Sequence, residues 1–445
     1  MRIRIVTTWA RLRSSFWFIP LLLILLAVAL AVGIPIAEKN MQPCDMPGGQ
    51  WLCYPGDLDG ARILSSMVAG SMISIAGTVF SITIAVLAFT SSAFGFRLLR
   101  NFRQDRGNQI VLGTFVATFI YCLLILHMLS DAEDAFIPRL SVTVGMALGL
   151  ISVVALIYFI HHIAESIQAN KVIASVGHDL DRILDHFFQN PGAPPPPQSE
   201  EVAEAAERII AEGRPIKARA SGYIQSIDTM RLMHLAVDRD MRIHLIRRPG
   251  HFATEEDTLA YISCQKPLPR AISRQINEAF ILGTERVPGQ DVEYALHQLV
   301  EIALRALSPS FNDPFTAMTC IDWLGASLNQ VAGRDVPSPY RHDQEGYLRL
   351  VLVPLTFDGL VNAAFDQIRQ TGRTSVSVTL RLLETMGIVM SHVQRQDYRQ
   401  IIREQAMATY RGIMATDIDK SDRRDVEQRF QKVLRAARAS GGSHI

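Results

Sequence analysis

The sequence predicts an α-helical membrane domain with four transmembrane helices, followed by a mainly α, α+β cytoplasmic domain with a small β insertion. Two observations lead to this fold class. Four long apolar runs lie in the first third of the chain, and each has about 20 or more residues, enough at a rise of about 1.5 Å per residue to cross a hydrocarbon core of roughly 30 Å. Beyond residue 165 the sequence is charged and patterned like a soluble protein. The predicted spans are residues 16–36, 63–89, 110–129 and 140–163.

These patterns divide the chain into four segments. The four-helix transmembrane domain takes residues 1–165. An amphipathic pattern followed by the prolines at 194–197 predicts a helical stalk and a semi-rigid spacer over residues 166–200. A small β-containing module is expected over residues 201–287, and a helical cytoplasmic domain over residues 288–445.

The charge distribution predicts the topology in the membrane. The 445 residues include 44 basic and 43 acidic side chains, but arginines gather before the first span and between the second and third spans. Loops rich in arginine stay in the cytoplasm, so we expect a multi-pass protein with both termini cytoplasmic. The first apolar run is about twice as long as the core of a secretory signal and is interpreted as an uncleaved anchor. The arginines before it are Arg2, Arg4, Arg11 and Arg13.

Small residues form a stripe along the second span. Ser66, Gly70, Ser74 and Thr78 recur every four residues on one helical face, and Gly77 and Ser81 lie on a neighbouring face. Small faces let helices approach closely in lipid, so the stripe is typical of helix packing and oligomerisation. The alternative is that these residues line a water-filled pore.

A basic segment follows this span. Its members are Arg97, Arg100, Arg103 and Arg106, each three residues after the one before. Such a segment acts as a topology signal and is attracted to anionic lipid headgroups. It is also a candidate anion or headgroup site, or the cytoplasmic mouth of a pore.

Titratable groups cluster at the end of the fourth span. His161 and Glu165 are four residues apart and share a helical face, and His162 adjoins them. Histidine titrates near neutral pH, so these three residues are candidates for a pH-sensing element. Adjacent histidines point about 100° apart on a helix and cannot both bind one ion, so no metal site is predicted.

Two cysteines fall in the one sizeable external loop. Cys44 and Cys53 flank the turn Pro47-Gly48-Gly49, and an oxidising compartment would allow them to form a disulfide. The sequence leaves open whether they pair.

The remainder of the chain reads as short strands and longer helices. Strands are expected at residues 221–227, 242–247, 259–263 and 347–353, and helices at residues 200–212, 229–238, 290–307, 314–331, 357–370, 376–393, 398–414 and 422–439. Asp313 suits the N-cap of a helix that begins at Pro314.

Several motifs together resemble a known family. They occupy residues 77–83, 97–102, 105–109, 158–164 and 306–317, and the similarity runs through nearly the whole chain. The chain resembles a family of bacterial predicted membrane proteins that is defined as a domain of unknown function. The resemblance implies a bacterial inner-membrane location and supplies no activity, substrate or catalytic residue. The family's turn implies glycine at position 310, where this chain has Ser310.

No enzymatic motif stands out. The sequence lacks a phosphate-binding loop, a dinucleotide fingerprint, a zinc-protease helix and a nucleophile elbow, so it predicts neither an enzyme nor a cofactor. The expected partners are the lipid bilayer and further copies of the chain, with no nucleic acid, and no soluble partner can be named.

Two functional hypotheses follow. The first is a homo-oligomeric channel or transport-like protein with a cytoplasmic regulatory domain, based on the small-residue stripe that ends in a basic segment. The second is a membrane-anchored scaffold or sensor whose cytoplasmic domain binds a partner, based on the size of the soluble part. Four spans are more than an anchor needs, which favours the first.

Overall fold

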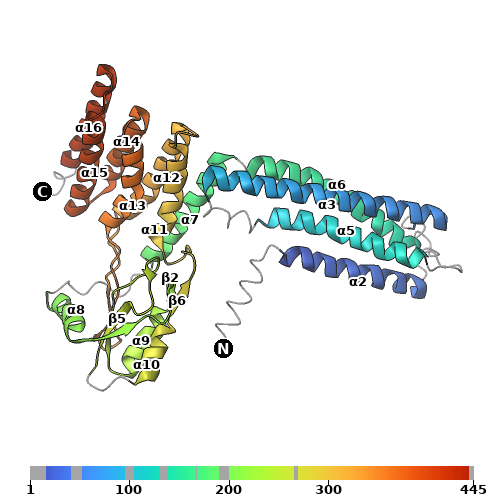
Figure 1. Cartoon of the computed structure of the whole chain (residues 1–445), viewed down its shortest axis with the longest axis horizontal. Coiled ribbons are helices and arrows are strands. Elements are labelled where there is room, and N and C mark those ends of the chain that lie inside the picture. Colours follow the sequence, from blue (N-terminus) through green and yellow to red (C-terminus); the bar gives the residue numbers. More distant parts are fainter. Residues whose placement is uncertain are drawn as a thin grey trace. The chain divides into compact units, whose positions relative to one another are not determined.

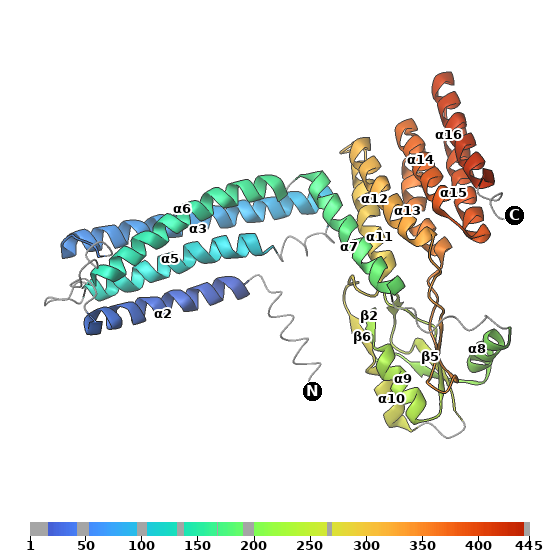
Figure 2. The same ribbon diagram turned by 180° about the vertical axis from the view of Figure 1, so that it is seen from behind.

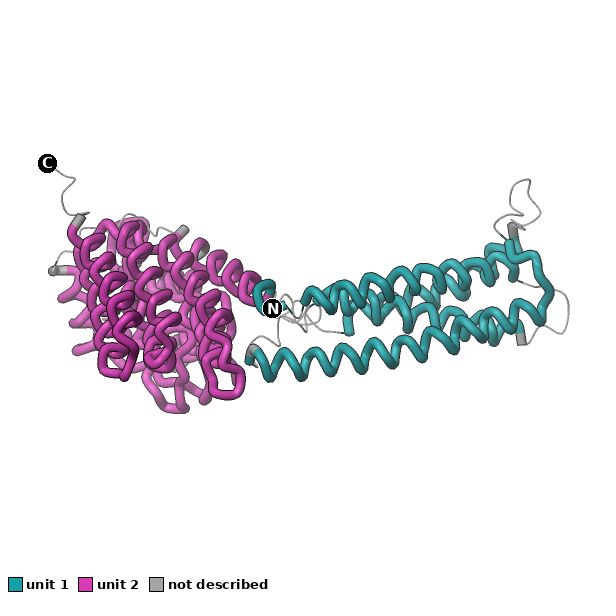
Figure 3. The backbone as a smooth tube through the Cα atoms, turned by 90° about the horizontal axis from the view of Figure 1, so that it is seen from above, with its two compact units in different colours: residues 1–171 teal, residues 172–445 magenta. Residues whose placement is uncertain are grey.

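The computed structural model describes residues 17–41, 53–95, 105–130, 138–166, 168–189, 200–264 and 269–439. The chain forms two compact units, unit 1 over residues 1–171 and unit 2 over residues 172–445 (Figure 3). Unit 1 contains the apolar helices, and unit 2 contains further helices together with all the strands of the described residues.

Unit 1 is built from four long helices that run side by side (Figure 1). All four are long and apolar enough to cross a membrane, which confirms the four spans predicted from the sequence. They are α2 (Phe18–Met41), α3 (Leu58–Phe94), α5 (Arg106–Ser130) and α6 (Arg139–Ser166).

Helix α5 is the centre of unit 1. Half of its most apolar window is buried, against 22% for each of the other three spans, and it packs against α2, α3 and α6. Phe115 and Tyr121 are fully buried on it. The Tyr121 hydroxyl donates to the Ser141 carbonyl at 2.9 Å, and the hydroxyls of Thr118 and Ser152 lie 3.1 Å apart. These bonds give the polar groups inside the bundle partners that lipid cannot supply.

The helices of unit 2 stack in two rows, which Figure 2 shows from behind. One row contains α11, α13 and α15, the other contains α12, α14 and α16, and neighbours within and between the rows are in contact. Stacks of helix pairs of this kind occur in α-solenoid proteins. The six helices are α11 (Val292–Ala306), α12 (Pro314–Ala332), α13 (Phe357–Thr371), α14 (Val376–His392), α15 (Gln396–Met414) and α16 (Lys420–Ala439).

The corner between α11 and α12 follows the sequence prediction. Asp313 caps α12 by accepting hydrogen bonds from the Thr316 backbone N–H at 3.1 Å and from its hydroxyl at 2.6 Å, and Pro314 begins the helix. Ser310 is not in the left-handed region. The residue of this corner with positive φ is Asn312, at 44°, a residue type that tolerates this conformation.

Two small sheets complete unit 2. The five-stranded sheet has the order β1-β5-β3-β8-β7, and the three-stranded sheet has the order β4-β2-β6. Strand β3 pairs in parallel with β8, so the sheet extends beyond the 201–287 module that the sequence suggested. The strands are β1 (Arg214–Lys217), β2 (Gly222–Ile227), β3 (Arg242–Leu245), β4 (Phe252–Ala253), β5 (Thr258–Ser263), β6 (Phe280–Gly283), β7 (Tyr340–His342) and β8 (Leu348–Val351).

One apolar core joins the strands to short helices. Ile224, Leu232, Ile243 and Ile276 are completely buried in it, and Leu350 of β8 belongs to the same cluster. The helices of this region are α8 (Glu200–Glu212), α9 (Thr229–Asp238) and α10 (Arg270–Asn277). The core therefore includes side chains that lie more than a hundred residues apart in the sequence.

Between Gly177 and Asp185, helix α7 (Ala169–Gln189) contacts α12 and the residues just after it. The Ser327 hydroxyl donates to Asp181 at 2.7 Å, and Arg334 lies 3.0 Å from Asp185. Gly177 faces the ring of Trp323. The stalk predicted over residues 166–200 is thus a packed element of unit 2 along α7, while its proline run lies outside the described residues.

The contact between α7 and α12 can be tested at Gly177. We expect Gly177→Ala to lower the free energy of unfolding by about 1–3 kcal/mol, the usual cost of overpacking, because a Cβ there would lie 2.2 Å from Trp323. The measurement is the thermal unfolding of the full chain in nanodiscs, followed by tryptophan fluorescence. Gly412→Ala is the control, since its Cβ would meet nothing within 4 Å and alanine favours helix by up to about 1 kcal/mol. Equal midpoints for the two variants would contradict this packing.

Candidate functional site

The small-residue stripe lies on the outer side of α3. Ser66, Gly70, Ser74, Gly77, Thr78 and Ser81 are all exposed in the single chain. A Cβ added at Gly70 or Gly77 would meet no atom within 4 Å. The buried side of α3, which carries Ala69, Met72 and Ala76, lies about half a turn away. Among the described residues, the stripe therefore packs against no other helix of its own chain.

Two hydroxyl groups of the stripe are bonded within α3. Thr78 Oγ1 donates to the Ser74 carbonyl at 3.2 Å, and Ser81 Oγ donates to the Gly77 carbonyl at 2.9 Å. Such bonds to the preceding turn satisfy a hydroxyl hydrogen without a partner helix. The oxygen lone pairs remain able to accept a bond from water or from another chain.

The predicted arginine site is described only in part. Arg106 is exposed at the first turn of α5, whereas Arg97, Arg100 and Arg103 lie outside the described residues. Binding of an anion or a headgroup by these four arginines stays a prediction.

His162 is joined to Asp105, which the sequence analysis had not singled out. The Asp105 carboxylate lies 2.6 Å from His162 Nε2, and its other oxygen accepts the Gly107 N–H at 2.8 Å. The ring of Tyr158 stacks on His162 with 5.4 Å between centroids. Asp105 therefore ties the start of α5 to the last part of α6. Its position just before a predicted span, where an acidic residue caps a helix, was the available signal.

The other two candidates for pH sensing form a separate exposed group. His161 Nε2 lies 3.6 Å from Glu165, and Lys171 lies 2.9 Å from the same carboxylate. The structure thus divides the predicted cluster, because His162 points to Asp105 and His161 points to Glu165. A role of these groups in sensing pH stays a prediction.

Two charged side chains link neighbouring helices at the opposite end of the bundle. The sequence analysis predicted a role for neither. Glu38 of α2 is only 4% exposed, and its carboxylate accepts the Leu140 N–H at 2.9 Å at the start of α6. Arg62 of α3 donates twice to the Leu129 carbonyl at the end of α5, at 2.8 and 3.2 Å. A negative charge at a helix start and a positive charge at a helix end both match the helix dipole.

The structure gives the bonding state of the cysteines in the described residues. Cys53 is buried and disulfide-bonded, whereas Cys122, Cys264 and Cys320 form no disulfide. Cys44 lies outside the described residues, so its pairing with Cys53 stays a prediction. Within the described ranges, no group of three histidine, cysteine or acidic side chains is arranged to hold a metal ion.

The Glu38 carboxylate offers a first test of unit 1. We expect Glu38→Ala to destabilise the bundle by about 1–3 kcal/mol, because the partly buried Leu140 N–H loses its acceptor. Glu38→Gln keeps a carbonyl oxygen at the same place and should cost less. Thermal unfolding of the full chain in nanodiscs measures both. Equal losses for alanine and glutamine would show that the hydrogen bond does not stabilise the bundle.

The adjacent histidines supply a matched pair for a second test. His162→Ala removes a bond to a carboxylate and should cost about 1.5–3 kcal/mol, whereas His161→Ala removes an exposed pair and should cost much less. The readout is the unfolding midpoint at one fixed pH. A larger loss for His161→Ala would reverse the assignment of the two roles.

Comparison with known proteins agrees with this architecture. The family model described as "Predicted membrane protein (DUF2254)" matches residues 13–387. The uncharacterized proteins Rv1290c of Mycobacterium tuberculosis and Mb1321c of Mycobacterium bovis are each 32% identical to this chain over 375 residues, which are 83% of this chain and 70% of the relative. No solved structure matches the chain. The chain therefore belongs to the family of predicted membrane proteins named DUF2254.

Proposed function

We propose that this protein is a homo-oligomeric channel or transport-like protein of the bacterial inner membrane, with unit 2 as its cytoplasmic regulatory domain. The observation that carries the proposal is the position of the small-residue stripe, which lies on the side of α3 that faces away from its own bundle. In the proposed assembly, the α3 helices of neighbouring copies meet along this stripe.

The outer faces of the four helices differ in a way that supports this assembly. Leu21 and Leu25 on α2 and Leu150 and Ile157 on α6 are exposed aliphatic side chains, as expected for surfaces in contact with lipid. The exposed side of α3 also carries aliphatic side chains such as Ile63 and Met67, but between them it presents the stripe of glycine, serine and threonine. In lipid, helices associate through such small residues, because close packing and hydrogen bonds replace the hydrophobic effect.

The same stripe suits the wall of a pore. Its hydroxyl oxygens can accept hydrogen bonds from water, and no acidic or basic side chain lies between Arg62 and Phe94 on α3. Arg106, together with the predicted arginines at 97, 100 and 103, would place positive charge at one mouth. Rings of arginine are typical of pores for anions, so anions are the proposed cargo.

A second candidate is a membrane-anchored scaffold or sensor. The two rows of helices in unit 2 favour it, because helix-pair stacks form extended surfaces that bind other proteins. In this case the spans would hold and oligomerise unit 2 without conducting.

Flux through liposomes separates these candidates. Purified protein should release trapped chloride, and Gly70→Leu or Ser74→Leu should change the rate at least several-fold, because each adds bulk to the stripe. Val154→Leu adds a leucine at an exposed position of α6 and should leave the rate unchanged. An unaltered rate in both stripe variants would remove α3 from the pore.

Cross-linking tests the assembly independently of conduction. Ser74→Cys should form covalent dimers under mild oxidation in nanodiscs containing the oligomer, whereas Val154→Cys should not. Cross-linking at position 74 without flux would favour the scaffold. Failure of both assays would overturn the proposed meeting of α3 helices.

A further inference from the structure

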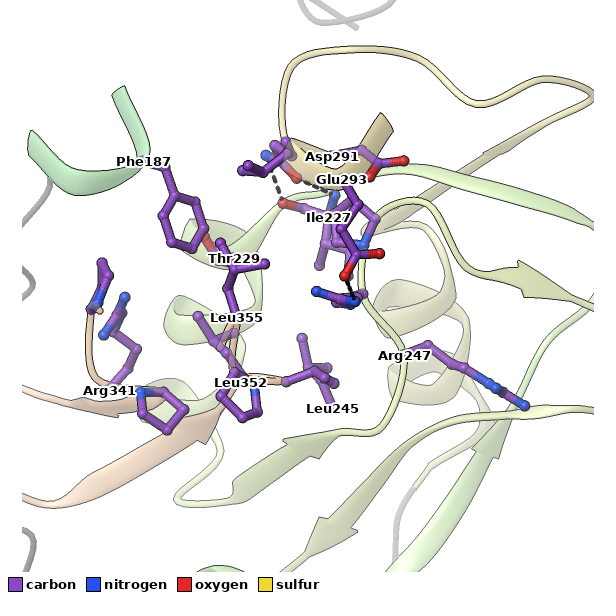
Figure 4. A pocket seen from close by; sticks show the side chains of 18 of the residues that line it. Phe187, Ile227, Thr229, Leu245, Arg247, Asp291, Glu293, Arg341, Leu352 and Leu355 are labelled. Atoms are coloured by element: carbon purple, nitrogen blue, oxygen red, sulfur yellow. Dashed lines mark hydrogen bonds and ion pairs between the residues drawn. The ribbon is translucent and has the colours of Figure 1, made fainter. Parts of the chain in front are cut away.

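Unit 2 contains a pocket of about 250 Å³ between its strands and the start of α11 (Figure 4). The end of β3, the residues that follow β8 and the first turn of α11 form its walls, and Phe187 of α7 closes one side. The volume lies just below the roughly 300–1,000 Å³ of ordinary ligand clefts, so the pocket suits a small molecule.

One wall of the pocket is apolar. Leu245, Leu352 and Leu355 lie together below Thr229 in Figure 4, and Phe187 lies above them, to the left of Thr229. Leu355 and Leu245 are almost fully buried, so this wall is anchored in the core of unit 2. Such a surface can accept the hydrocarbon part of a ligand.

The acidic groups of the pocket already have cationic partners. Arg286 donates two hydrogen bonds to Asp291, at 2.7 and 2.8 Å, and Asp291 also caps α11 by accepting the Tyr294 N–H. Arg248 pairs with Glu293 at 2.5 Å. These pairs are neutral overall, so the acidic residues neither attract a cation nor repel an anion strongly.

Arg341 differs from the other arginines of the pocket. It is half-buried and donates to the backbone carbonyls of Ser338 and Tyr340, and it contacts no acidic side chain among the described residues. Burial lowers the pKa of its guanidinium, whereas the Asp291 carboxylate helps to raise the pKa of Arg286. A half-buried guanidinium without a counter-ion is poorly solvated and gains most from a bound anion.

The remaining arginine of the lining, Arg247, does not compete for the same ligand. Its side chain points away from the pocket in Figure 4 and lies 3.6 Å from Asp257. Arg341 is therefore the one cation of the described pocket lining that faces the space without an acidic partner.

We propose that this pocket binds a small organic anion, whose carboxylate or phosphate pairs with Arg341 and whose apolar body packs against Phe187, Leu352 and Leu355. The guanidinium fork matches both oxyanions, so the chemistry shared by the two ligand classes defines the site. The proposal concerns unit 2 alone and holds whether the spans conduct or only anchor.

Calorimetric titration of the full chain in nanodiscs tests the site, with empty nanodiscs as the blank. The probes are benzoate and phenyl phosphate, with benzyl alcohol and benzylamine as their uncharged and cationic counterparts. We expect at least one anion to bind at about 1 mM or tighter, and neither counterpart to bind as well. The tighter anion identifies the carboxylate or the phosphate class.

Three variants connect the binding to the pocket. Arg341→Gln should weaken anion binding about tenfold or more, because a charge-assisted hydrogen bond is lost. Thr229→Phe keeps Arg341 but fills the space and should also weaken binding. Arg403→Gln removes an exposed charge on α15 and should leave the affinity within about twofold of the unmodified protein.

Three results would overturn the site. They are the absence of binding by both anions, equal binding of benzyl alcohol, and anion binding that survives both Arg341→Gln and Thr229→Phe. Thr229→Phe leaves the ion pairs of Asp291 and Glu293 in place, so it keeps the test decisive if Arg341→Gln does not fold.

Discussion

The hydrocarbon core of a bilayer offers no hydrogen-bond partner to a peptide group, and the arrangement of unit 1 follows from this constraint. Helices satisfy their own backbone except at their ends, where four N–H and four carbonyl groups stay unpaired. The bundle supplies side chains at those ends. Glu38 receives the N–H of Leu140, Arg62 caps the carbonyl of Leu129, and Asp105 accepts from Gly107. Each of these bonds to a helix end also joins different helices or a helix and its preceding turn, so satisfying the backbone fixes the bundle.

The same constraint applies to the outer face of α3. An exposed leucine is expected where a helix contacts lipid. A row of exposed glycine and hydroxyl residues makes less apolar contact with lipid along several helical turns. Ala69, Met72 and Ala76 provide the contact with the bundle, and the row lies on the opposite side of α3. In the oligomer proposed above, a second chain or water would contact this row.

The sequence predicted those features that depend on local pattern. Run length located the four spans, and the cap at Asp313 with Pro314 located the start of α12. Features that depend on residues far apart in the sequence could not be predicted. The parallel pairing of β3 with β8 joins segments about a hundred residues apart, and nothing in either strand specifies the other. The bond between Asp105 and His162 and the arrangement of helices in two rows could not be predicted either. Periodicity identifies the buried face of a helix but not the element that packs against that face.

That distant pairing also builds the anion pocket. Strand β7 pairs with β8, and β8 with β3, so the crossover brings Arg341 into the lining that also includes Leu245 at the end of β3. The Asp291 carboxylate meanwhile holds the first turn of α11 and engages Arg286, which leaves Arg341 as the unpaired cation of the described lining. A ligand on Arg341 would touch α7, the sheet and the start of the helical stack together. Binding there would therefore stabilise the junction of these elements, by an amount set by the ligand concentration relative to its dissociation constant.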